Sequence, residues 1–147
     1  RARSWGWTGV PDALEPIARE HPVGTARLIT SYTAARDWIA GVNGSVVVCS
    51  NQGFEDRRDA QGFARPRGVW PHCMCFIAVD DTAPRPGLLC CNSWGPAWIS
   101  GPTRHNQPPG SFWVDAETAD RMLRQGDSHG VSDFRGLGPR TIDWIMY

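Results

Sequence analysis

Two apolar segments joined by a turn constrain the fold of this chain more than any other sequence feature. HCMCFIAVDD (72–81) and LLCCN (88–92) have the length and the apolar character of buried strands. The intervening TAPRPG supplies the proline and glycine that turns favour. The pattern predicts an antiparallel hairpin, in which the start of the first strand lies beside the end of the second.

A helix and a third strand are predicted before this hairpin. Four apolar residues at the i, i+3, i+4, i+7 spacing indicate one helix face: Ala35, Trp38, Ile39 and Val42. Ser31 or Thr33 can cap the start of this helix, and Asn43-Gly44 can end it. SVVVCS (45–50) is apolar and β-branched, which is typical of a buried strand.

A fourth strand and a second helix are predicted after the hairpin. SFWV (111–114) is the strand, and Asp115 caps a helix that ends at Gly126 and buries one face: Ala116, Ala119, Met122 and Leu123. Residues 51–68 and 95–110 are polar and glycine-rich, so we expect surface loops there, the first a long excursion. The elements together predict an α+β fold with a small, mostly antiparallel sheet and flanking helices.

The length of the chain, 147 residues, is that of one domain. Residues 1–22 are rich in Trp and Pro and predict an irregular lead-in with at most one short helix around 12–20. We expect the sheet subdomain over 23–125 and a tail of little periodicity over 126–147. The first residue is not Met, so we expect that an upstream part was removed or that the chain belongs to a longer product.

Charge and hydropathy argue against two classes of partner. The formal net charge is zero, so no basic surface predicts nucleic-acid binding. No apolar run reaches the roughly 20 residues of a membrane span. The arginines at 57–58 and 65–67 predict a solvated loop, with an anionic partner as the alternative. We assign no role to His21, His105 and His129, which lie in irregular segments and are expected to be solvated.

The five cysteines all lie in apolar, strand-like segments: Cys49, Cys73, Cys75, Cys90 and Cys91. We expect buried free thiols in a reduced compartment, with disulfides as the less favoured alternative. Adjacent strand residues point to opposite faces, which separates Cys90 from Cys91. The same alternation places Cys73 and Cys75 on one face and His72 on the other, so we predict no zinc site and no cofactor.

His72 opens the first strand of the predicted hairpin, and Asn92 closes the second. A symmetric loop would place His72 opposite Pro96, so a bulge or an asymmetric loop is needed to bring Asn92 level. An amide oxygen that accepts from one imidazole nitrogen would fix the ring and leave the other nitrogen for a nucleophile. Trp94 and Trp98 could cover the bond; the alternative is a hairpin end with core aromatics.

This order of motifs resembles the right-hand half of a papain-like cysteine peptidase. His72 is followed by an apolar strand, a short turn and the string NSWG (92–95), with Trp98 close behind. The helix and strand before the histidine and the strand after the tryptophans agree with that family. The resemblance covers roughly residues 23–125, and it implies the sheet-bearing subdomain of the family.

The resemblance implies a role for each residue of the motif. His72 would be the general base that activates a thiol, and Asn92 would orient its ring. Trp94 would shield the Asn–His contact from water, with Trp98 as a second shielding aromatic. Cys73 would lie near the pocket that receives a substrate side chain.

The nucleophile that the family requires has no counterpart in this chain. Cys49 is the only cysteine before His72, and it lies in a strand rather than at the start of a helix. The resemblance therefore implies that an upstream segment or a companion chain carries the cysteine, with a peptide as substrate. The alternative is a catalytically silent module that acts as an interaction component of a larger assembly.

Overall fold

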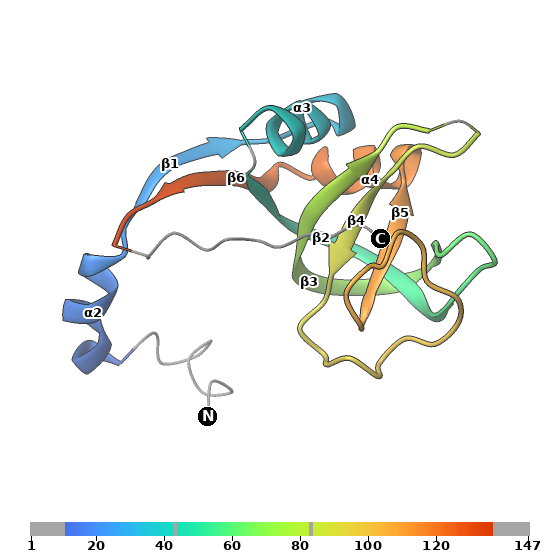
Figure 1. The fold of residues 1–147 in the computed structure, drawn as a ribbon, viewed down its shortest axis with the longest axis horizontal. Coiled ribbons are helices and arrows are strands. Elements are labelled where there is room, and N and C mark those ends of the chain that lie inside the picture. Colours follow the sequence, from blue (N-terminus) through green and yellow to red (C-terminus); the bar gives the residue numbers. More distant parts are fainter. Residues whose placement is uncertain (1–10, 43, 83, 137–147) are drawn as a thin grey trace. The chain divides into compact units, whose positions relative to one another are not determined.

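The computed structural model describes residues 11–42, 44–82 and 84–136, and these form an α+β fold (Figure 1). The strands are β1 (Val23–Leu28), β2 (Ser45–Arg58), β3 (Ala64–Asp80), β4 (Gly87–Cys91), β5 (Ser111–Asp115) and β6 (Asp127–Phe134). The helices are the 3₁₀ turn η2 (Asp12–Leu14), α2 (Glu15–Glu20), α3 (Tyr32–Val42) and α4 (Ala116–Leu123). The strands make one mostly antiparallel sheet in the order β1-β6-β2-β3-β4-β5.

The chain divides into a larger compact unit, Thr25–Ser132, and a smaller one formed by both ends of the chain. Within the smaller unit, α2 confirms the short helix expected around 12–20. Pro16 lies in its first turn, where a missing N–H breaks no helical hydrogen bond. An ion pair between Arg19 and Glu15, at 3.0 Å, joins its two ends.

The predicted hairpin and both predicted helices of the larger unit are confirmed. β3 pairs antiparallel with β4, as the two apolar segments required. Ser31 Oγ accepts from Ala34 N at 3.2 Å at the start of α3, and Asp115 Oδ1 accepts from Thr118 N at 2.9 Å at the start of α4. Val42 is half-exposed and does not belong to the core face of α3. Asn43, the expected stop signal, lies outside the described residues.

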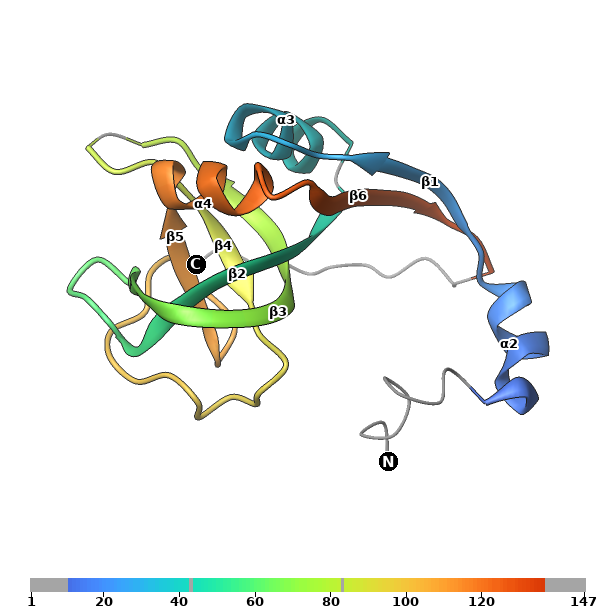
Figure 2. The same ribbon diagram turned by 180° about the vertical axis from the view of Figure 1, so that it is seen from behind.

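The long surface excursion predicted over 51–68 is wrong. β2 and β3 run through this segment as a continuous hairpin, which Figure 2 shows as two long, curved strands. Its turn is closed by Asp59, whose Oδ1 accepts from the N–H groups of Gln61 and Phe63. The register shifts at three places, so polar and apolar residues do not alternate regularly along the segment. The polar residues of this segment therefore gave no indication in the sequence that it forms a pair of half-exposed strands.

β6 is a strand that the sequence did not predict. It pairs with β2 and extends the sheet beyond residue 125. Only small residues face the interior here, because Ser128 and Gly130 are buried. A side chain at Gly130 would meet the indole of Trp38 at 2.6 Å, so the glycine makes room for α3. DSHGVSDF thus has no apolar pattern from which a strand could be predicted.

The main core lies between one face of the sheet and the helices α3 and α4. Buried apolar side chains from these elements fill it, among them Trp38, Ile39, Val46, Val48, Phe76, Leu88, Phe112, Met122 and Leu123. The two helices also meet directly, since Asp120 Oδ1 accepts from Tyr32 N at 2.9 Å. On the opposite face, a second small cluster contains Phe63, Leu89 and Trp113.

The expectation of free thiols is wrong for Cys49 and Cys73, which form a disulfide. They are direct partners in the β2–β3 register, with Cα atoms 4.0 Å apart. The spacing of the two segments along the chain gives no register, so the pairing could not be predicted. Cys75, Cys90 and Cys91 remain free. As predicted, Cys90 is buried in the core while Cys91 is on the other face.

Asp80 ties the end of β3 to the loop before β5. Its carboxylate pairs with Arg104 and, at 2.9 Å, with His105, so this exposed histidine has a partner that the sequence did not indicate. Burial acts to raise the pKa of Asp80, but hydrogen bonds from Thr82 and His105 and the charge of Arg104 outweigh it and lower the pKa to about 2.

We predict that replacing Cys49 and Cys73 together by Ala lowers the free energy of unfolding by about 3 kcal/mol, because the disulfide restricts the unfolded chain. Denaturant titration without reductant measures the change. The control is Cys75→Ala, a free thiol on the same strand and face, which we expect to change stability by about 1 kcal/mol or less. Equal stability of the oxidised and reduced wild-type protein would contradict the prediction.

We predict that Asp80 contributes an acid-sensitive part of the stability. Because its folded pKa is depressed, the contribution is present above the unfolded pKa of about 4 and is lost as the pH falls towards 2. Thermal unfolding between pH 5 and pH 2 should show a steeper decline for the wild-type protein than for Asp80→Asn. Parallel curves for the two proteins would exclude this role.

Candidate functional site

The β3–β4 hairpin contains one irregularity of the kind that was expected to bring Asn92 closer to His72. Cys75 pairs with Cys91 and Phe76 with Cys90, but the next pair is Ala78 with Leu89. Ile77 is therefore left without a partner in β4, as at a β-bulge. The shift draws the end of β4 back along β3 by one residue, towards His72.

His72 and Asn92 are joined by a hydrogen bond of 2.9 Å between Nε2 and Oδ1. An amide oxygen can only accept, so Nε2 is the donor in this bond, and in the neutral form of the ring the lone pair is on Nδ1. Within the described residues no group is hydrogen-bonded to Nδ1. Both side chains are half-buried. The ring is thus fixed at one nitrogen and open at the other.

Trp94 stacks on the imidazole of His72. The two ring centroids are 5.1 Å apart and the ring planes are 26° from parallel. The expected covering residue is therefore in contact with the histidine, although its own side chain is 51% exposed. Stacking on one ring face limits rotation of the imidazole and excludes water from that side.

Trp98 supports Trp94 rather than touching His72. The centroids of the two indoles are 5.4 Å apart, in an edge-to-face arrangement. The Trp98 N–H donates to the carbonyl of Gly110 at 2.5 Å, and its ring packs on Phe112 of the core. A series of aromatic contacts therefore connects the core to the imidazole ring.

Trp70 is a member of this site that the sequence analysis missed. Its ring centroid lies 4.8 Å from Trp94 and 6.2 Å from Trp98. A side chain at Gly53 of β2 would collide with the Trp70 indole, so the glycine is required for this packing. The signal was present in the strand alternation, because Trp70 and His72 are two residues apart and share one face.

Asn92 has a second polar group that the described residues leave unsatisfied. Its Nδ2 is buried and has no hydrogen-bond acceptor in this part of the chain. Buried amide groups without an acceptor are rare in native proteins, because they have lost their hydration. An acceptor from outside the described residues would complete the site.

Cys73 was expected near a substrate pocket beside the imidazole, but its side chain does not lie on that face of the sheet. It follows His72 on β3 and is directed to the other face of the sheet, where it is bonded to Cys49. The expectation that it borders a substrate pocket gains no support from this position.

None of the five cysteines is placed to act as a nucleophile with His72. Two are joined in the disulfide, and Cys90 is buried in the core. Burial, together with the neighbouring thiols Cys91 and Cys75, raises the pKa of Cys90 well above its usual value. Burial likewise raises the pKa of Cys75 and of Cys91. These thiols therefore stay protonated at neutral pH.

Two further features concern the described residues only. No group of three or more His, Cys, Asp or Glu side chains among them converges in a way that could hold a metal ion. Among their helices, none has the length and apolar character needed to cross a membrane.

Comparison of the sequence with models of known protein families and with curated proteins gives no match. The resemblance to papain-like cysteine peptidases therefore stays a prediction, carried by the motif and by the geometry of the site.

We predict that the Nε2–H proton of His72 is protected from solvent exchange, since it donates to Asn92 and lies under Trp94. A ¹⁵N-resolved spectrum at neutral pH should show this proton in the wild-type protein and lose it in Asn92→Ala. The variant should also lose about 1 kcal/mol of stability.

The matched control for this experiment is Ser93→Ala, an exposed neighbour of Asn92. It should leave the proton signal unchanged. If the signal persists in Asn92→Ala, the hydrogen bond does not orient the ring.

Proposed function

We propose that this chain supplies the base half of a papain-like cysteine peptidase site. His72 is the general base, Asn92 holds its ring and Trp94 shields their contact. The nucleophilic cysteine comes from an upstream segment or a companion chain. The observation that carries the proposal is the 2.9 Å bond between His72 Nε2 and Asn92 Oδ1, which leaves Nδ1 open beneath the stacked Trp94.

The proposed reaction uses both protonation states of His72. Nδ1 takes the proton of the incoming thiol, and the thiolate attacks the carbonyl carbon of a peptide bond. The imidazolium then gives that proton to the leaving amine as the C–N bond breaks, which leaves a thioester. Next, His72 accepts a proton from water as the water attacks the thioester, and returns it to the thiol when the acid leaves. Asn92 keeps the ring aligned through each transfer.

Two observations favour a thiol from outside the described residues. The cysteines of this chain are oxidised, buried in the core, or have raised pKa values, so none offers a thiolate to Nδ1. Asn92 Nδ2 also lacks an acceptor, which a covering segment could supply. A site that holds an oriented base but, within the described residues, lacks both a nucleophile and an acceptor for Asn92 fits half of a two-part catalytic centre.

The coarse architecture is compatible with the proposed family. The strands β2 to β5 follow α3 and precede α4, and they form a mostly antiparallel sheet with β1 and β6. His72 lies within β3, and Asn92 directly follows the adjacent strand β4. We propose that the larger unit is the right-hand, sheet-bearing subdomain of a papain-like peptidase.

A second candidate is a papain-like module that binds a partner without catalysis. The half-exposed Trp94 favours it, because an exposed indole within an aromatic cluster is typical of protein interfaces. This candidate needs the same fold but no thiol opposite Nδ1.

The test is labelling of the intact parent protein or complex with a thiol-reactive epoxide peptidase probe. We expect His72→Ala to slow labelling at least about 100-fold, since it removes the general base, and Asn92→Ala about tenfold, since the ring loses its support. Mass spectrometry of the labelled peptide identifies the cysteine.

His129→Ala is the matched control, because His129 is an exposed histidine on β6 outside the site. It should label at the wild-type rate. Unchanged labelling of His72→Ala would refute the base assignment. A parent in which another residue replaces the expected cysteine would favour the binding module.

A further inference from the structure

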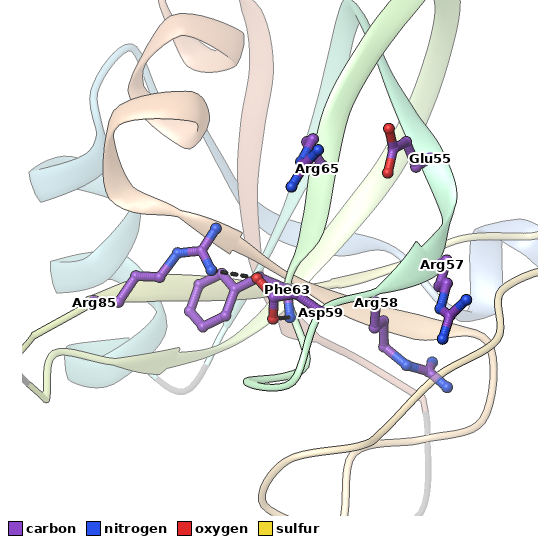
Figure 3. A pocket seen from close by; sticks show the side chains of 7 residues that line it. All are labelled: Glu55, Arg57, Arg58, Asp59, Phe63, Arg65 and Arg85. Carbon is purple, nitrogen blue, oxygen red and sulfur yellow. Dashed lines mark hydrogen bonds and ion pairs between the residues drawn. The ribbon is translucent and has the colours of Figure 1, made fainter.

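A pocket of about 400 Å³ lies towards the turn of the β2–β3 hairpin. Figure 3 shows the side chains that line it: Glu55, Arg57, Arg58, Asp59, Phe63, Arg65 and Arg85. None of them belongs to the His72 site, because His72 pairs with Ser50, which precedes all the lining residues on β2. The volume is that of a small-molecule site.

The charges that line this pocket do not balance. Four arginines face two carboxylates, and one of the carboxylates is already neutralised, because Asp59 pairs with Arg85 at 2.5 Å. Burial acts to raise the pKa of Asp59, but the hydrogen bond from Arg85 and two main-chain N–H groups lower it, so the pair stays charged. Three arginines then remain against Glu55.

Two of the remaining arginines have no partner in the described part of the chain. The side chains of Arg57 and Arg65 make no ion pair or hydrogen bond there, and both are exposed. They come from β2 and β3, on either side of the hairpin (Figure 3). Each guanidinium can offer two parallel N–H groups to a carboxylate or phosphate.

Arg58 adds a fixed positive charge at the edge of the pocket. It is 7% exposed and donates to three main-chain carbonyls, those of Pro102, Ser111 and Gly101. No carboxylate of the described residues pairs with it. A buried cation without a counter-charge is screened less than a surface one, so it strengthens the positive potential nearby.

Phe63 gives the pocket a rigid wall. Its ring is fully buried, and the Arg85 guanidinium lies 4.0 Å from the ring centroid. This contact and the ion pair with Asp59 hold Arg85 in place. The pocket therefore has a pre-formed side, and its two free arginines can adjust to a ligand.

We propose that this pocket is a binding site for a small oxyanion, the carboxylate or phosphate group of a small molecule. Arg57 and Arg65 bind the anion, and Arg58 supplies the field that attracts it. Glu55 is the only lining carboxylate without a cation, and it weakens the binding of an anion.

Isothermal titration of the 147-residue chain with inorganic phosphate and, separately, with malonate tests the proposal against sodium chloride of equal ionic strength. We expect at least one of the two anions to bind, and the comparison tells phosphate from carboxylate. Arg57→Gln and Arg65→Gln should each weaken binding about tenfold or more. Glu55→Gln should tighten it, because the repulsion is removed.

The matched control is Arg67→Gln. Arg67 is exposed on the same strand, two residues beyond Arg65, and does not line this pocket. Its loss should leave binding within about twofold of the wild-type value. The proposal is overturned if neither anion binds more tightly than chloride, or if Arg67→Gln weakens binding as much as Arg65→Gln.

Discussion

The pairing of β3 with its two neighbours is the constraint on which the rest of the structure depends. Successive side chains of a strand point to opposite faces, so β3 can contribute to the core and the site on one face and to the disulfide on the other. Met74 and Phe76 enter the core, His72 continues the same face into the site, and Cys73 is bonded to Cys49 on the other face. A slip of one residue would exchange these faces and remove both the disulfide and the site.

The candidate site is an extension of the core. Phe112, Trp98 and Trp94 form a series of aromatic contacts that ends on His72. Because Phe112 is buried and Trp98 is partly buried against the core, the imidazole is oriented by rigid neighbours as well as by Asn92. The same arrangement explains why Trp94 is half-exposed: it is the indole farthest from the core in this series, at the surface of this unit.

The hairpin of β2 and β3 places two different chemistries on one element. Its middle carries His72 opposite Ser50, and its turn region carries the arginine pocket. Arg58 connects the hairpin to the loop before β5 through the carbonyls of Gly101 and Pro102, and to β5 itself through that of Ser111. The loop that holds Trp98 is thereby tied to the strand that lines the pocket. The hydrogen bonds of a buried cation thus give this loop a fixed position.

Periodicity and turn chemistry in the sequence alone determined α3, α4, the β3–β4 hairpin and the position of His72 and Asn92 at one end of it. These follow from local patterns, because caps, apolar spacing and Pro-Gly turns act over a few residues. Only the tertiary structure decided the Cys49–Cys73 disulfide, the place of Trp70 and the strand β6. Each depends on the register between segments far apart in the chain, and register is set by packing of the whole sheet rather than by any local pattern.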